Sequence, residues 1–100
     1  MKKFFAYEKS VEFYNEIKGI KMPYYLKDQI LRAASSITLN LAEGSAKQSL
    51  KEQARFYQIA HGSMNECQGV LKLQGLENQK IYNESKFLGW VIWKLIKSRE

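Results

Sequence analysis

Apolar residues recur at steps of three and four along most of the chain, and no stretch alternates between apolar and polar positions as a half-buried strand would. The first such segment covers about residues 3–18 and places a wide apolar arc opposite an acidic line. The arc comprises Phe4, Ala6, Tyr7, Val11, Phe13, Tyr14 and Ile17, and the acidic line comprises Glu8, Glu12 and Glu16. We therefore expect a first amphipathic helix, which Gly19 ends.

A second helical pattern follows Met22 and Pro23 and runs from about Tyr24 to Glu43. Its apolar stripe comprises Leu26, Ile30, Ala33, Ala34, Ile37 and Leu41. Gly44 is expected to end this helix.

A capping box, Ser49-Leu50-Lys51-Glu52, marks the start of a third helix, because the serine hydroxyl can accept from the amide of Glu52 while the Glu52 carboxylate reaches back. Gly75 is expected to end it. Its stripe comprises Phe56, Ile59, Ala60, Ser63, Cys67, Val70, Leu71 and Gln74. Asn78 is expected to cap a fourth helix, whose stripe comprises Ile81, Leu88, Val91, Ile92 and Leu95.

Four amphipathic helices joined by short connections bury their stripes most simply as an antiparallel up-down-up-down four-helix bundle. With 100 residues, the chain has room for a single domain, residues 1–100, around one modest core. Hydrophobic residues at 45% and charged residues at 26% are typical of a soluble globular protein. The expected class is all-α.

The longest apolar run, Phe87 to Trp93, is far below the roughly 18 residues needed to cross a bilayer. Near the start of the chain, Glu8 and Lys9 interrupt the apolar run before the core of an export signal can form. We therefore expect a cytoplasmic protein that engages no membrane.

Cys67 and His61 are each the only residue of their type, so the chain can form no internal disulfide and no thiolate zinc cluster. Six positions apart on one helix, they fall on different faces, which disfavours a catalytic pair. A core cysteine and a surface histidine are the preferred interpretation. We expect neither a cofactor nor a bound metal.

Polar residues also follow helical spacing, and they flank the apolar stripe of the second predicted helix. They are Gln29, Arg32, Ser36, Asn40, Glu43 and Lys47, and the third helix carries a comparable line of Glu52, Arg55, Gly62 and Glu66. We expect Arg32 and Arg55 to pair with Glu66 and Glu43 across a helix contact, because a planar guanidinium suits a carboxylate. Such a network would fix helix register within the bundle or between subunits.

The same two carboxylates, Glu43 and Glu66, permit a different hypothesis, in which they act as acid and base or hold a metal in a hydrolase or nuclease. No histidine lies on either polar line, and the Glu-x-x-His motif of di-iron bundles is missing from the sequence. We therefore do not expect an enzyme.

The fourth predicted helix carries the clearest binding surface, and the net charge of +6 favours nucleic acid as its partner. The candidates recur opposite its apolar stripe and are Lys86, Trp90, Lys94 and Lys97. Aromatic residues interleaved with lysines hold nucleic acid by charge and stacking, and without a groove-reading motif we expect contacts with the RNA or DNA backbone. Exposed tryptophans such as Trp90 and Trp93 also mark subunit interfaces, where the acidic line of a neighbouring first helix could meet these lysines.

Residues 26–66, LKDQILRAASSITLNLAEGSAKQSLKEQARFYQIAHGSMNE, resemble the four-helix-bundle family named for open reading frames in 23S ribosomal RNA intervening sequences. The shared features are Gln29-Ile30-x-Arg32-Ala33-Ala34, Ser36-Ile37, Asn40-Leu41-Ala42-Glu43-Gly44, and Ala60-x-Gly62-Ser63 followed by Glu66. Two features depart from the family pattern. The segment Met22-Pro23-Tyr24-Tyr25-Leu26 shortens the first loop, and His61 stands where the family commonly has arginine.

The resemblance implies a four-helix bundle that assembles into a ring, expected to be a homopentamer. It also implies kinship with the accessory proteins of diversity-generating retroelements, which bind nucleic acid and a reverse transcriptase. We accordingly expect a non-enzymatic, oligomeric, nucleic-acid-binding adaptor. The alternative is a protein-interaction scaffold that engages a partner enzyme such as a reverse transcriptase.

Overall fold

The computed structural model describes residues 4–100, so the predicted helix start at residue 3 and the lysines Lys2 and Lys3 lie outside the described residues. Within this range the chain forms four helices and no strand. They are α1 (Phe5–Lys18), α2 (Tyr24–Ser45), α3 (Leu50–Leu73) and α4 (Lys80–Lys97). The all-α class and the predicted number of helices are confirmed.

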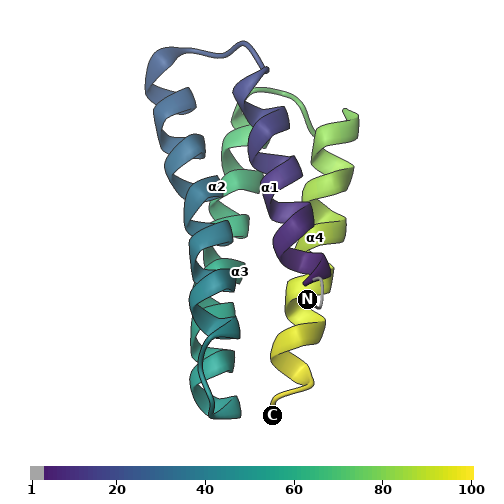
Figure 1. Ribbon diagram of the computed structural model, residues 1–100. Coiled ribbons are helices and arrows are strands. Elements are labelled where there is room, and N and C mark those ends of the chain that lie inside the picture. Colours follow the sequence, from purple (N-terminus) through teal and green to yellow (C-terminus); the bar gives the residue numbers. More distant parts are fainter. Residues whose placement is uncertain (1–3) are drawn as a thin grey trace.

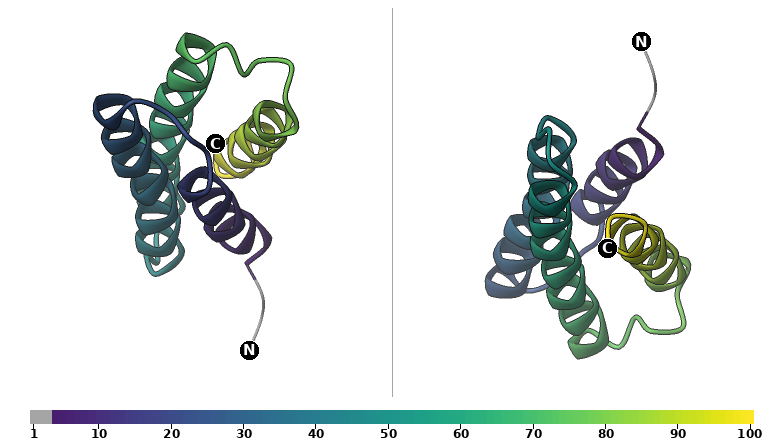
Figure 2. Two further views of the ribbon diagram at one scale, coloured as in Figure 1. Left: turned by 90° about the horizontal axis from the view of Figure 1, so that it is seen from above. Right: turned by 90° about the horizontal axis from the view of Figure 1, so that it is seen from below.

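The helices pack in a closed cycle, α1 on α2, α2 on α3, α3 on α4 and α4 on α1, and neither diagonal pair packs directly within residues 4–100. The chain reverses direction at each short connection (Figure 1). The contact between α2 and α3 is the most extensive and that between α1 and α4 the least. Seen along the bundle, α2 and α3 lie side by side, with α1 and α4 on the other side (Figure 2).

Most helix ends follow the local chemistry of the sequence. The Ser49 hydroxyl accepts from the Glu52 amide at 3.0 Å, which begins α3 as predicted. Gly75 follows α3 with a φ of 70°, and the amides of Gly75 and Leu76 donate to Lys72 and Leu71, the bonding pattern of a Schellman motif. The predicted cap at Asn78 is wrong: α4 begins at Lys80 and its N-cap residue is Gln79.

Gly44 does not end α2, contrary to prediction, because the helix continues to Ser45 and Gly44 is buried in its last turn. A Cβ at position 44 would lie 2.7 Å from Cε1 of Tyr57 and 3.1 Å from Cβ of Phe56. Glycine is therefore required here by the close approach of α3, not by a change of backbone conformation.

The core confirms the predicted stripes of α1 and α2 and the C-terminal half of that of α3, where Cys67, Val70 and Leu71 are buried, but it differs from the prediction in the N-terminal half of α3. Tyr57 and Met64 are buried, whereas Ile59 is 43% exposed and Phe56 is only half-buried. Ala60 is buried as predicted, so the buried side of α3 is displaced only locally, from Phe56, Ile59 and Ser63 towards Tyr57 and Met64. This local displacement places the large Tyr57 ring against the small Gly44, so volume complementarity decides the register of the two helices.

Candidate nucleic-acid interface

The predicted binding residues Lys86, Trp90, Lys94 and Lys97 are all exposed along α4, and we call them the α4 face. α4 presents them because its opposite side is buried against the bundle, where Leu88 and Ile92 are almost inaccessible. Trp90 is 54% exposed, and the neighbouring Trp93 is 44% exposed. Both indoles therefore face solvent over much of their surface in the single chain.

Lysine ammonium groups lie directly beside the two indoles. Lys94 Nζ is 5.5 Å from the ring centroid of Trp90, and Lys97 Nζ is 5.6 Å from that of Trp93. Such contacts place positive charge over an aromatic surface. Lys97 also pairs with Glu100 at 3.1 Å, so part of its charge is already compensated.

The exposed aromatic surface continues from α4 onto α1. The rings of Phe87 and Trp90 have centroids 6.2 Å apart, and Phe5 meets Phe87 edge-on, also at 6.2 Å. Lys9 lies 5.7 Å over Phe5 at the end of this row. Phe5, Phe87 and Trp90 thus form one continuous row, which we call the aromatic row.

An open hollow of about 270 Å³ lies between α3 and α4, beside the aromatic row. We call it the α3–α4 hollow, and its lining residues are His61, Asn65, Gln68, Lys86, Gly89, Trp90 and Trp93. The side-chain amide of Gln68 donates to the backbone carbonyl of Ser85 at 3.2 Å and so joins the two helices beneath it. Sequence reasoning missed the three α3 residues, although their spacing of four and three positions puts them on one helix face.

The predicted ion pairs of Arg32 with Glu66 and of Arg55 with Glu43 are wrong for the single chain. Arg32 is 80% exposed and pairs with Asp28 on its own helix at 2.6 Å. Glu43 likewise pairs at 3.1 Å with Lys47, which lies just beyond the end of α2. Neighbours four residues away in the sequence reach these groups at less conformational cost than residues on another helix.

Arg55 lies with its guanidinium 4.7 Å from the ring of its neighbour Phe56, which Lys47 also approaches at 5.3 Å. Arg55 therefore lies on the same ring as Lys47, the partner of Glu43, but it forms no ion pair with the Glu43 carboxylate among residues 4–100. Arg32, Glu43 and Arg55 are consequently surface charges of the monomer.

Side-chain hydrogen bonds, and not the predicted guanidinium pairs, make the polar contact that joins α2 to α3. Ser63 Oγ donates to Ser36 Oγ at 2.9 Å, and the side-chain amide of Asn40 donates to the same hydroxyl at 3.1 Å. At the other end Gln29 Nε2 donates to Glu66 Oε2 at 3.1 Å. Of the five predicted network residues, Asn40 and Glu66 therefore lie in this contact, which we call the α2–α3 polar seam.

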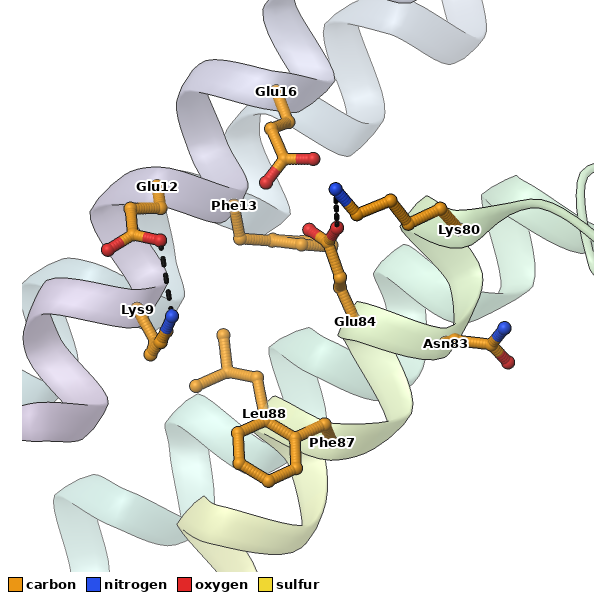
Figure 3. A pocket seen from close by; sticks show the side chains of 9 residues that line it. All are labelled: Lys9, Glu12, Phe13, Glu16, Lys80, Asn83, Glu84, Phe87 and Leu88. Carbon is orange, nitrogen blue, oxygen red and sulfur yellow. Dashed lines mark hydrogen bonds and ion pairs between the residues drawn. The ribbon is translucent and has the colours of Figure 1, made fainter.

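A groove of about 430 Å³ separates α1 from α4, where the helix contact is weakest (Figure 3). Glu16 of α1 and Glu84 of α4 both point into it, and Lys80 lies 3.6 Å from Glu84. A hydrogen bond to Glu84 is the main cause that raises the pKa of Glu16, and burial adds to it. Glu12, also on the predicted acidic line, pairs with Lys9 at 3.4 Å.

Two further observations concern the described part of the chain. Among residues 4–100, no three His, Cys, Asp or Glu side chains are placed to share a metal ion. None of the helices in the same range has the length and apolarity needed to span a membrane.

Residues 2–90 match the family model described as 23S rRNA-intervening sequence protein. The match includes α1, α2 and α3 and the part of α4 that carries Lys86 and Trp90. Trp93, Lys94 and Lys97 lie beyond it. No curated protein matches the sequence.

Proposed function

Since the chain belongs to the 23S rRNA-intervening sequence protein family, as the resemblance predicted, we propose that it is a non-enzymatic, homo-oligomeric protein that binds RNA or DNA through its α4 face. The observation that carries this proposal is the pairing of Lys94 with Trp90 and of Lys97 with Trp93 on exposed surface. Lysines attract phosphates, and the adjacent indoles add stacking, which is the combination that holds nucleic acid strands.

Assembly into a ring, expected to be a homopentamer, belongs to the same proposal. It is supported by uncovered apolar surface on another side of the bundle, where Leu39 is 67% exposed. Leu39 lies with Val11 and Tyr14 along a shallow, almost wholly apolar hollow of about 200 Å³ between α1 and α2. A ring would repeat the α4 face in every subunit and so raise avidity for a long polyanion without any new contact.

Binding without catalysis is supported by the positions of the two carboxylates that sequence reasoning considered for chemistry. Glu43 is held by Lys47 and Glu66 by Gln29, and both carboxylates are on exposed surface. Metal-assisted phosphoryl transfer instead needs carboxylates that converge on one ion and its substrate. The arrangement of Glu43 and Glu66 therefore favours a role in surface contacts over a role in catalysis.

The test measures affinity for structured RNA and for duplex DNA between about 50 and 200 mM salt. The slope of log K against log salt then reports how many counterions are released on binding. Replacing Lys86, Lys94 and Lys97 by Gln should flatten the slope of log K against log salt on duplex DNA, by up to about 0.9 for each phosphate that is no longer neutralised. The matched control replaces three other exposed lysines, Lys18, Lys21 and Lys51, and removes the same charge elsewhere.

We expect the control variant to retain most of the salt dependence. Equal losses in the two variants would show that net charge alone acts and would contradict the assignment to α4. No binding at the lowest salt concentration would contradict nucleic-acid binding itself.

The aromatic row favours a second candidate, a scaffold that engages a partner enzyme such as a reverse transcriptase. Phe5, Phe87 and Trp90 present contiguous apolar surface, of the kind that anchors protein interfaces. A partner enzyme encoded nearby should then co-purify with the chain and should be lost with Phe87→Ala. Good nucleic-acid binding with no such co-purification would count against the scaffold.

A further inference from the structure

The α3–α4 hollow differs from a merely basic surface because aromatic, amide and cationic groups line it together. Trp90 and Trp93 come from α4, and Asn65 and Gln68 come from α3. Gly89 is buried at its floor, where a Cβ would lie 3.5 Å from Gln68 Nε2 and from Met64 Cγ. Because Gly89 has no side chain, the floor of the hollow is flat, and the two indoles and the side-chain amides of Asn65 and Gln68 surround this floor.

The polar groups of the hollow match the edge of a nucleobase. An Asn or Gln side chain offers a carbonyl acceptor and two N–H donors, as the edges of unpaired bases require. Gln68 uses an N–H on the Ser85 carbonyl, which fixes its amide and leaves its second N–H for a ligand. Asn65 is exposed and makes no hydrogen bond with residues 4–100 through its side chain.

The charges around the hollow suit a strand that carries phosphates. Lys86 lines the hollow itself, Lys94 lies over Trp90, and Lys97 lies over Trp93. Among the described residues, no Asp or Glu contributes to the lining. A base placed against the indoles would therefore have its sugar-phosphate backbone among ammonium groups.

We propose that the α3–α4 hollow holds an unpaired nucleobase, so that the ligand of the α4 face is single-stranded nucleic acid, a deepening that rests on the proposed nucleic-acid binding. The faces of bases in a duplex are stacked on their neighbours and cannot lie against Trp90 or Trp93. A single strand can place successive bases on aromatic side chains while lysines follow its backbone.

The charges disfavour a second copy of the chain as the occupant of this hollow. A two-fold contact would place Lys86, Lys94 and Lys97 opposite lysines, and a head-to-tail contact in a ring would need a matching acidic surface on the neighbour. A contact with the acidic line of a neighbouring α1 is weakened because Glu12 already pairs with Lys9. Phosphates remain the anions that complement the patch.

The tryptophans make the proposal directly measurable, because Trp90 and Trp93 are the only two in the chain and both line the hollow. The probes are a short oligothymidylate, an abasic strand of equal length and charge, and a duplex of equal length. We expect the oligothymidylate to quench tryptophan fluorescence and to bind about fivefold or more tightly than the abasic strand, since stacking one base contributes about 1–3 kcal/mol.

Trp90→Leu and, separately, Asn65→Ala should each reduce the preference for the base-bearing strand over the abasic strand. Tyr25→Leu is the matched control, because Tyr25 is an exposed aromatic residue on α2, away from the hollow. Helix content and assembled mass are measured for every variant. A change of assembled mass in Trp90→Leu would identify the hollow as a subunit interface and overturn the proposal.

The outcomes separate this proposal from the proposed function. If abasic, base-bearing and duplex probes bind equally well with a steep salt dependence, backbone binding stands and the base-holding hollow is rejected. If none of the probes binds at the lowest salt concentration, both are rejected.

Discussion

Gly44 of α2 and Tyr57 of α3 pack so closely that a Cβ at position 44 would lie 2.7 Å from the tyrosine ring. The Tyr57 ring is almost fully buried, and it is also approached by the ring of Phe4 at 6.1 Å and by the Arg99 guanidinium at 5.1 Å. The ring is therefore confined on several sides. The contact therefore fixes the position of α2 against α3 at the end of the bundle where they are connected.

Gly44→Ala should consequently destabilise the protein through overpacking, while Gly62→Ala should stabilise it. Gly62 is the matched control, because it is exposed in α3 and a Cβ there would meet nothing within 4 Å. Both changes gain helix propensity, less at Gly44 because it lies in the last turn of α2, so the difference between them mainly reports the overlap with Tyr57, about 1–3 kcal/mol. Urea unfolding of the two variants measures it. Equal stability of the two variants would show that α2 and α3 accommodate the methyl group.

The α2–α3 polar seam predicts an energetic coupling between Ser36 and Ser63, whose hydroxyls are 2.9 Å apart. Ser36→Ala and Ser63→Ala should each cost about 0.5–1.5 kcal/mol, and the double variant should cost less than their sum because the two residues share one hydrogen bond. A double-mutant cycle in denaturant unfolding provides the measurement. Strict additivity would exclude the bond from the stable native state.

Arg32 provides the opposite expectation. Its guanidinium is mostly exposed and pairs with Asp28 on the same helix. Arg32→Ala should change the free energy of unfolding of the monomer by no more than about 1 kcal/mol, since exposed ion pairs contribute little. Combination with Glu66→Gln should show no coupling. If the loss is larger and depends on protein concentration, Arg32 acts between subunits.

The carboxyl pair in the α1–α4 groove predicts a pH dependence. The hydrogen bond between Glu16 and Glu84, and the partial burial of Glu16, raise the pKa of the Glu16 carboxyl. The folded state therefore keeps the proton of this carboxyl to higher pH than the unfolded state does. The resulting stabilisation is complete below the unfolded pKa of about 4.5 and is lost as the pH rises through the folded pKa. Glu12 and Lys80 face the same groove and also influence Glu16.

Glu16→Gln should therefore be more stable than the natural sequence near neutral pH, because an uncharged amide replaces the second carboxylate. Since Glu16 is largely exposed, the gain should be small, at most about 0.5 kcal/mol, and should vanish at acidic pH. Thermal unfolding from acidic to neutral pH measures the difference. Glu8→Gln, which removes the same charge from an exposed position of α1 outside the groove, is the control.

Cys67 should be unreactive in the folded protein. Burial is the main cause that raises the pKa of its thiol to about 12, and the nearby Glu66 contributes. The thiolate, which is the form that reacts with an alkylating reagent, is therefore scarce near neutral pH. Iodoacetamide labelling followed by mass spectrometry should proceed only as fast as the core opens, and it should accelerate in urea. Rapid labelling in native buffer would contradict the buried position.

The sequence predicts the helices well because their evidence is local. The hydroxyl of Ser49 and the glycine at position 75 act on backbone groups within a few residues, so their effects are visible in the sequence. Gly44 shows the limit. Its sequence context resembles a helix stop, but its role depends on a ring that arrives from another helix.

The candidate site divides in the same way. The spacing along one helix is sufficient to place Lys86, Trp90, Lys94 and Lys97 on an exposed face. The contribution of Asn65 and Gln68 depends on which residues of α4 pack beside this part of α3, and the spacing along α3 alone does not show that. The predicted guanidinium pairs failed because partners four residues away in the sequence are closer: Asp28 pairs with Arg32 and Lys47 pairs with Glu43.

The closed cycle of contacts makes α1 the least attached helix, since it touches only α2 and, weakly, α4. Helices α2, α3 and α4 are consecutive in sequence, and the contacts of α2 with α3 and of α3 with α4 do not involve α1. We therefore expect the detachment of α1 to be the partial unfolding reaction with the lowest free energy, which native-state hydrogen exchange would measure. Detachment of α1 would expose the apolar core beside the α1–α4 groove and leave Trp90 and Trp93 in place on α4.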